Sequence, residues 1–225
     1  MTQHIGIVAC SAEGAALCYR TICVEGEAML GRSHAHPEVS MNTPSLAEYM
    51  GHIYRGDWPA VGELMLASVE KLKAAGATFA ICPDNTIHQA LPLIEKRSPL
   101  PWLHIARVVD AEAKARGFRR IGLLGTKWLV DSAVYPADYV RPSAEERIEI
   151  NRIIMDELVK SVFKPEGVAY HCKVIDRLRA HGCDAVALSC TEIPLIINNG
   201  NSSLPTLDST RLLARAALKR AINDA

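Results

Sequence analysis

The chain has 225 residues, 49% of them hydrophobic and 22% charged, a composition typical of globular proteins and a length that allows one large domain or two small ones. Lysine and arginine together number 25, as do aspartate and glutamate, so the formal net charge is zero. A balanced charge excludes a strong general attraction to nucleic acid or to an anionic membrane, and we expect neither as a partner.

Three features of the sequence indicate the compartment: its apolar runs, its first residues and its cysteines. No apolar run approaches the ~20 residues that a membrane-spanning helix needs. The opening residues MTQHIGIVACSAEG lack the basic region of a signal peptide and lead directly into an apolar stretch. The seven cysteines are scattered and form no CxxC pair. We therefore expect reduced thiols and a cytoplasmic location.

The first half of the chain predicts alternating strands and helices. Residues 4–9 (HIGIVA) are an apolar run closed by small residues, as in a buried parallel strand. Residues 59–75 predict a helix that Gly76 ends. Its apolar stripe consists of Val61, Leu64, Met65, Val69 and Leu72. Residues 79–82 predict the next strand.

The second half continues this alternation. A helical pattern over residues 101–117 ends in glycine and precedes a strand at 120–124. Ser143-x-x-Glu146 has the form of a capping box, and it opens a long helix with inward positions at Ile150, Ile153, Ile154, Leu158 and Val162. A helix over 168–182 and a strand at 185–188 follow, and Asp208 or Ser209 caps a final helix. The order predicts an α/β fold with a parallel sheet.

An internal repeat is the most informative feature of the sequence. The motif at 5–8 (IGIV) reappears at 121–124 (IGLL), and residues 76–84 align with 182–190 without a gap. In both longer segments a glycine ends a helix, an apolar strand follows, and Asp84 or Cys190 lies eight positions after the glycine. Any two strand–helix units share part of this pattern. The polar residues that follow favour two related halves, whose strand ends would line one cleft.

Asp84 and Cys190 are the first candidates for chemistry. Each lies where a strand ends and a helix would begin, so backbone N–H groups there favour an anion, and Asn85 and Thr86 add side-chain donors. A cysteine at a helix N-terminus has a stabilised thiolate, although an inert buried cysteine is an equal alternative for Cys190. The alternative for Asp84 is a helix N-cap, and both roles can coexist.

The segments CPDNTIH (82–88) and LSCTEIPL (188–195) resemble the two signature segments of the aspartate/glutamate racemase family. The resemblance extends to residues 6–14, 121–125 and 205–214. It implies two pseudo-symmetric, parallel-sheet α/β domains of the Rossmann-like three-layer type, with the active site in the cleft between them. We place the first domain at 1–103 plus 207–225 and the second at 104–206. The resemblance also implies no cofactor, no metal, a small carboxylate or amino acid substrate, and a homodimer.

In that family two cysteines, one from each domain, flank the α-carbon of the substrate. Cys190 matches the second cysteine, whereas Asp84 holds the position of the first. A carboxylate opposite a thiol would tend to share one proton with it, which is the state that two-base proton transfer requires. We therefore expect an amino acid racemase or epimerase that exchanges the α-proton between these two residues. The alternatives are a related decarboxylase or cis–trans isomerase that uses Cys190 alone, and a non-catalytic carboxylate-binding protein.

The resemblance also implies the residues that hold the substrate. Its carboxylate would be bound by Asn85 and Thr86 from one half and by Thr191 from the other, with Ser11 and Cys10 lining the cleft. Relatives acting on acidic amino acids place an arginine near residues 42–44, and this segment, VSMNTPSLAEYM, has none. Lys164 is a candidate for that cation, with a solvated surface lysine as the alternative.

Four further features have two interpretations each. His88 could orient Asp84 or pack at the domain seam. Glu192 is expected to bind a helix-end donor, with a direct influence on Cys190 as the alternative. Cys82 is expected to be a core residue, because period-two alternation places it one step deeper than Asp84. The cluster His34-x-His36-x-Glu38 lacks a further ligand at convincing spacing for zinc.

Overall fold

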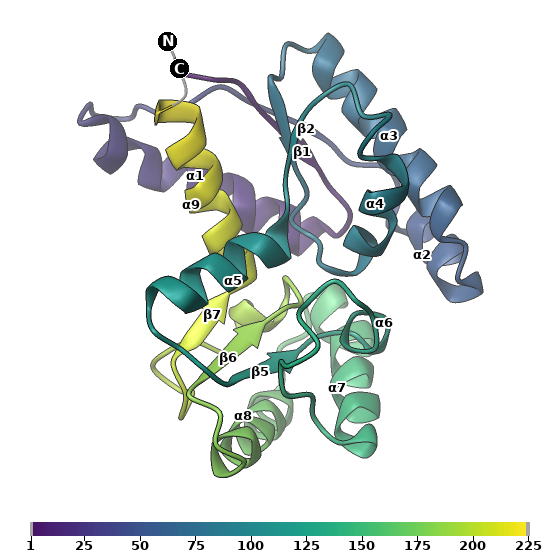
Figure 1. The fold of residues 1–225 in the computed structure, drawn as a ribbon, viewed down its shortest axis with the longest axis vertical. Coiled ribbons are helices and arrows are strands. Elements are labelled where there is room, and N and C mark those ends of the chain that lie inside the picture. Colours follow the sequence, from purple (N-terminus) through teal and green to yellow (C-terminus); the bar gives the residue numbers. More distant parts are fainter. Residues whose placement is uncertain (1, 224–225) are drawn as a thin grey trace. The chain divides into compact units, whose positions relative to one another are not determined.

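The computed structural model describes residues 2–223 and divides into two compact units (Figure 1). The first unit comprises the chain up to Ile105 and from Thr210 onward, and the second comprises Ala106–Ser209. The boundaries expected from the sequence, after residues 103 and 206, lie close to these two crossings. Within residues 2–223, no helix combines the length and the apolar character needed to cross a membrane.

The first unit contains a four-stranded parallel sheet with the order β2-β1-β3-β4. Its strands are β1 (Ile5–Val8), β2 (Val39–Asn42), β3 (Phe79–Ile81) and β4 (Trp102–Leu103). Its helices are α1 (Ala12–Leu30), α2 (Leu46–Arg55), α3 (Trp58–Ala74), the short η1 (Thr86–Ala90) and α4 (Leu91–Ile94), and α9 (Ser209–Asn223) returns to it.

The central strands of this sheet are apolar because helices cover both faces. All four residues of β1 and all three of β3 are buried. Helix α3 packs against β1 and β2, while α1 and α9 lie together on the opposite side (Figure 1). An ion pair between Arg215 and Glu25 joins these two helices at 2.7 Å. A strand covered on both faces cannot show a polar alternation, which explains the continuous apolar runs of the sequence.

The second unit contains a three-stranded parallel sheet with the order β5-β6-β7. Its strands are β5 (Ile121–Leu124), β6 (Ala185–Leu188) and β7 (Thr206–Asp208). Its helices are α5 (Ile105–Ala115), α6 (Lys127–Val130), α7 (Ala144–Asp156), η2 (Leu158–Lys160), α8 (Pro165–Ala180) and η3 (Ile193–Leu195).

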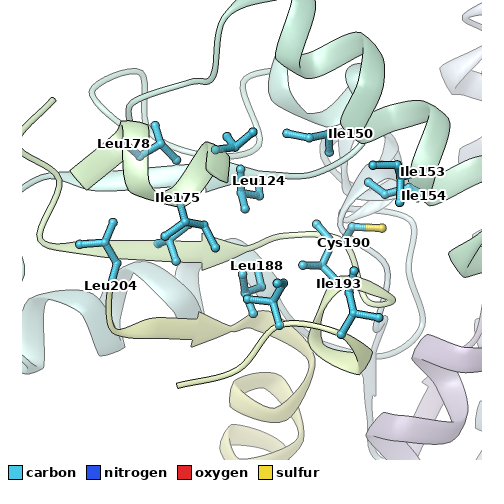
Figure 2. Packing of buried hydrophobic residues seen from close by; sticks show 14 of the residues in the cluster. Leu124, Ile150, Ile153, Ile154, Ile175, Leu178, Leu188, Cys190, Ile193 and Leu204 are labelled. Carbon is cyan, nitrogen blue, oxygen red and sulfur yellow. The ribbon is translucent and has the colours of Figure 1, made fainter. Parts of the chain in front are cut away.

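The core of the second unit forms where α7 and α8 meet β5 and β6 (Figure 2). Ile153 and Ile154 of α7 and Ile175 of α8 are buried in the same apolar cluster as Leu188 of β6. Helix α7 begins at the predicted capping box, in which the Ser143 hydroxyl accepts from a backbone N–H and the Glu146 carboxylate returns the contact. Cys190 lies at the end of this apolar cluster, beside Ile193 (Figure 2).

The internal repeat of the sequence corresponds to a repeated local geometry. Gly76 and Gly182 both have left-handed backbone angles, with φ of +97° and +85°. Each ends a helix, and the strand that follows, β3 or β6, pairs in parallel with the first strand of its own unit. A left-handed residue at this place favours glycine, because a Cβ would strain the backbone. The repeat is therefore structural as well as sequential.

The structure confirms the α/β class and corrects several details of the predicted elements. The helix predicted over 101–117 is a short strand, β4, followed by α5, which begins only at Ile105. The long helix predicted from Ser143 ends at Asp156, and the chain then turns through η2, so Val162 is exposed at 41% rather than inward. Strands β2 and β7 are short and carry polar residues, which conceals them in the sequence.

Candidate active site

In the first unit, Asp84 lies in the short connection between β3 and η1. Its carboxylate accepts a hydrogen bond from the Ile87 N–H at 3.0 Å. This contact satisfies one of the unpaired donors at the start of the helical turn, as the N-cap alternative predicted, although the residue that directly precedes η1 is Asn85 rather than Asp84. The same contact holds the carboxylate in a fixed direction, which a group that transfers protons also requires.

His88 fixes the backbone of Asp84. Its ring Nδ1 donates to the Asp84 carbonyl oxygen at 2.6 Å, and its Nε2 accepts from the Ile105 N–H at 3.4 Å. Both ring nitrogens are thus used by the neutral ring in one tautomer. Burial, and secondly the nearby His104, lower the pKa of His88 to about 3. Of the two roles considered for His88, orientation of Asp84 is the one that this geometry supports, through the backbone rather than the carboxylate.

Tyr49 of α2 is a member of this region that the sequence did not reveal. Its side chain is fully buried, and burial raises its pKa, with further increases from the nearby Cys82, Cys10 and Asp84. Cys82 is also fully buried, and its pKa is raised well above the usual range, first by burial and then by Asp84. The core role predicted for Cys82 is therefore confirmed. Both neighbours of Asp84 are neutral groups in the folded protein.

The predicted substrate contacts of the first unit lie at the ends of two adjacent strands. Cys10 and Ser11 follow β1, whereas Asn85 and Thr86 follow β3, and these strands pair directly. The Ser11 hydroxyl accepts from the Gly14 N–H at 3.3 Å and so caps α1. Because the carboxyl ends of paired parallel strands share one edge of the sheet, these residues and Asp84 gather at that edge.

In the second unit, Cys190 follows β6 and forms a compact group with the next two residues. Its thiol donates to Oε2 of Glu192 at 3.0 Å, and the Thr191 hydroxyl donates to the same oxygen at 3.1 Å. Glu192 is only 3% exposed, and its other oxygen, Oε1, is buried without a partner among the residues that the structure describes. The helix-end role expected for Glu192 is wrong, because its side chain does not cap η3.

Cys190 and Glu192 therefore form a buried thiol–carboxylate contact. In this contact the thiol is the hydrogen-bond donor and the carboxylate is the acceptor, so the sulfur carries a proton. The helix expected to follow Cys190 is only the three-residue η3 (Ile193–Leu195).

Lys164 precedes α8 and pairs with Glu157 at 3.4 Å. Its side chain is 53% exposed, whereas that of Glu157 is 6% exposed and also binds Arg152 at 2.9 Å. Among the two interpretations of Lys164, the structure therefore shows a surface lysine with a structural partner. A role in substrate binding would require it to leave that partner.

The histidines at 34 and 36 point to local partners. The His34 ring is 94% exposed and lies 3.9 Å from Glu27, and Nδ1 of His36 contacts the Pro37 carbonyl at 2.8 Å. Over residues 2–223, no three side chains of His, Cys, Asp or Glu are grouped so that they could hold a metal ion.

The chain is an α/β protein made of two similar parallel-sheet units. In each unit a titratable side chain, Asp84 or Cys190, follows the strand that pairs with the first strand, β3 beside β1 and β6 beside β5. The sequence model of the family described as Asp/Glu/Hydantoin racemase matches residues 7–217. The chain belongs to this family, whose members named as racemases are isomerases.

Relatives and solved structures agree with this assignment. The chain is 23% identical over 154 residues to the broad-specificity amino-acid racemase RacX of Bacillus subtilis, an alignment that spans 66% of each chain, just under two thirds of that relative. A crystal structure of a candidate Asp/Glu racemase from Yersinia pestis is similar with a TM-score of 0.88 and 29% identity, covering 98% of this chain and 100% of that one. An aspartate racemase homologue from Pyrococcus horikoshii follows with a TM-score of 0.82 and 25% identity, covering 98% and 99%.

Proposed function

We propose that this protein is an amino acid racemase or epimerase that moves the α-proton of its substrate between Asp84 and Cys190. The observation that carries the proposal is the equivalence of these two positions. Each follows the strand that pairs with the first strand of its unit, eight residues after a left-handed glycine. In a duplicated fold, equivalent positions are where a pair of groups of matched function is expected.

In the proposed reaction one proton is removed from the α-carbon of the substrate and another is added to it. The Asp84 carboxylate removes the α-proton from one face of the substrate, and the electron pair of the broken C–H bond remains on the α-carbon. The Cys190 thiol then gives its proton to the opposite face and becomes a thiolate. For the other enantiomer the roles are exchanged. Positioned groups of this kind contribute about 10² to 10⁴ in rate.

In the proposed complex, Asn85, Thr86 and Thr191 bind the substrate carboxylate, with Ser11 and Cys10 beside them. Hydrogen bonds to a carboxylate stabilise the charge that develops next to it in the transition state. The name of the Bacillus subtilis relative and the lack of an arginine at 39–50 both favour a substrate that is not restricted to aspartate or glutamate. The family resemblance implies that no cofactor takes part.

Exchange in D₂O tests the proposal directly. Each enantiomer of a broad amino acid panel is incubated with the protein, and α-deuterium and optical rotation are followed together. We expect deuterium in the product enantiomer of at least one amino acid, and loss of this exchange in Cys190→Ser. An absence of α-deuterium across the whole panel would overturn the proposal.

A second candidate function, chemistry that uses Cys190 alone, is favoured by the contacts of the Cys190 thiol. The thiol already has a carboxylate partner within its own unit, whereas a capping contact holds the Asp84 carboxylate. A reaction that needs one proton donor, such as a decarboxylation or cis–trans isomerisation, could proceed with Cys190 alone. In that case Asp84→Asn would retain activity while Cys190→Ser would abolish it.

A non-catalytic carboxylate-binding protein is the remaining alternative. It would bind a small carboxylate, measured by calorimetry, without isotope exchange at any pH. The homodimer and the cytoplasmic location expected from the sequence are kept as predictions, which light scattering and cell fractionation can check.

A further inference from the structure

A cavity of about 560 Å³ lies in the second unit, between α5 and the loop that follows α6. Its walls come from residues 106–110 and from the loop between Asp131 and Arg141. The volume falls in the range of small-molecule sites, about 300–1,000 Å³. Neither Asp84 nor Cys190 lines it, so it is separate from the proposed catalytic residues.

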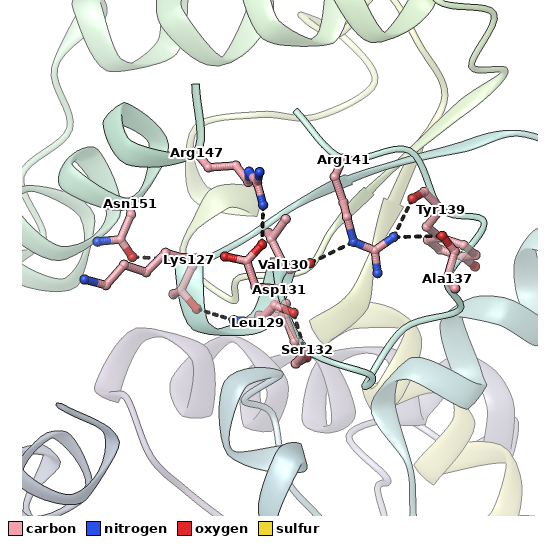
Figure 3. A network of polar contacts seen from close by, with 11 residues as sticks. Lys127, Leu129, Val130, Asp131, Ser132, Ala137, Tyr139, Arg141, Arg147 and Asn151 are labelled. Atoms are coloured by element: carbon pink, nitrogen blue, oxygen red, sulfur yellow. Dashed lines mark hydrogen bonds and ion pairs between the residues drawn. The ribbon is translucent and has the colours of Figure 1, made fainter. Parts of the chain in front are cut away.

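The two carboxylates of this cavity are neutralised by cations outside it. Asp110 forms an ion pair with Lys114 at 2.6 Å and accepts a hydrogen bond from the Tyr139 hydroxyl at 3.4 Å. Asp131 forms an ion pair with Arg147 of α7 (Figure 3). Neither Lys114 nor Arg147 is a lining residue. Asp110 and Asp131 therefore line the cavity, but their ion pairs offset most of the negative charge that a ligand would meet.

The two arginines of the cavity have no such compensation. Arg141 donates from Nε to the Val130 carbonyl at 2.8 Å, and from Nη1 to the carbonyls of Ala137 at 3.1 Å and Tyr139 at 2.6 Å (Figure 3). These neutral acceptors hold the guanidinium in place without cancelling its charge. Arg107 makes no hydrogen bond or ion pair with any residue that the structure describes, although it lines the same cavity.

We propose that this cavity binds a small anion through a carboxylate or phosphate group. Two arginines without carboxylate partners line one cavity that is open to solvent, and guanidinium is the side-chain group best matched to planar carboxylate and to phosphate. The backbone contacts of Arg141 fix its direction before the ligand arrives, which lowers the entropy cost of binding. This site is independent of the proposed racemase activity, and its test does not use turnover.

Isothermal titration calorimetry of the full chain tests the site, with succinate and inorganic phosphate as separate probes at constant ionic strength. Succinamide is the uncharged control for succinate. We expect saturable one-to-one binding of at least one of the two anions and none of succinamide. Binding of only succinate or only phosphate identifies the preferred group, and failure of both anions to bind overturns the proposal.

Three variants locate the binding. Arg107→Gln should weaken it about tenfold or more, the loss expected for one charge-assisted contact, and Arg107→Lys should retain most of it. Arg20→Gln is the matched control. Arg20 is an exposed arginine of α1, and its replacement removes the same charge from the first unit. Arg107 has no structural partner, so Arg107→Gln should fold normally, which circular dichroism verifies. Equal affinity in Arg107→Gln, or an equal loss in Arg20→Gln, would refute the site.

Discussion

The two units of this protein share a strand–glycine pattern but hold their acid/base groups in different ways. In the first unit, the Asp84 carboxylate accepts from a backbone N–H, that of Ile87, and the Asp84 carbonyl accepts from His88. In the second unit, the Cys190 thiol instead donates to a side-chain carboxylate, that of Glu192. The carboxylate therefore meets a neutral backbone donor, whereas the thiol meets a side-chain carboxylate acceptor. The repeat places the two residues at equivalent positions, and different contacts hold them there.

Replacement of Cys190 is expected to have the largest effect. Cys190→Ser keeps the size of the side chain but replaces the thiol with a much weaker acid. We expect α-proton exchange to fall about 10³-fold for both enantiomers, measured by deuterium incorporation. Cys172→Ser is the control, since Cys172 is a half-buried cysteine of α8 in the same unit. A loss below tenfold would remove Cys190 from the reaction.

Replacement of Asp84 distinguishes a two-sided from a one-sided mechanism. Asp84→Asn should lower exchange about 10²-fold, unequally for the two enantiomers, because only one proton-transfer face loses its base. Asp84→Cys should retain more activity than Asp84→Asn, since it places a titratable group in both units. Initial rates for each pure enantiomer measure both effects. Full activity of Asp84→Asn would favour the chemistry that needs Cys190 alone.

The contact between Glu192 and Cys190 predicts opposite changes in two measurements. Glu192→Gln removes the negative charge beside the thiol, so alkylation of Cys190 by iodoacetamide at neutral pH should become faster. Exchange should become about tenfold slower, because the protonated thiol loses the partner that orients it. Mass spectrometry of the modified peptide follows the alkylation. A decrease of both rates would instead show that Glu192 acts as a base toward the thiol.

His88 predicts a dependence of stability on pH. Its pKa falls from 6.5 to about 3 on folding, so between these values the unfolded chain binds a proton that the folded protein does not. The stability is therefore full above pH 6.5 and declines as the pH falls toward 3, by at most about 1.4 kcal/mol per pH unit for this group.

Urea unfolding between pH 7 and pH 4 measures this slope. His88→Asn should flatten it while lowering stability at pH 7, because two buried hydrogen bonds are disturbed. His34→Asn is the control, since that ring is 94% exposed. An unchanged slope in His88→Asn would show that other groups, such as the buried His171, cause the acid sensitivity.

The smallest effect is expected for Lys164. Lys164→Ala removes a half-exposed ion pair, while Glu157 keeps Arg152, so stability should change by less than about 1 kcal/mol. Michaelis constants for aspartate and alanine should each change less than about twofold. A large increase for aspartate alone would show that Lys164 leaves Glu157 to bind a distal carboxylate.

The sequence predicted the residues of the candidate site better than their contacts. Asp84 and Cys190 could be located because the repeat places each after a glycine and an apolar strand. Tyr49 could not, because a tyrosine in an amphipathic helix gives no sign of which polar groups its hydroxyl will approach. The prediction for Glu192 was wrong for a related reason. The sequence shows only that Glu192 lies two residues after Cys190, whereas the backbone at the start of η3 determines the direction of its side chain.

By itself, the sequence determined the α/β class, the repeat, the strand ends and the residue types available for proton transfer. These features depend on local periodicity and on the left-handed backbone angles that glycine readily adopts. The tertiary structure of each unit decided which partners those residues meet. His88 reaches both Asp84 and Ile105, and Arg107 and Arg141 line one cavity, only because distant segments pack together. Burial and charge pairing arise from that packing, and they determine which of these groups are charged.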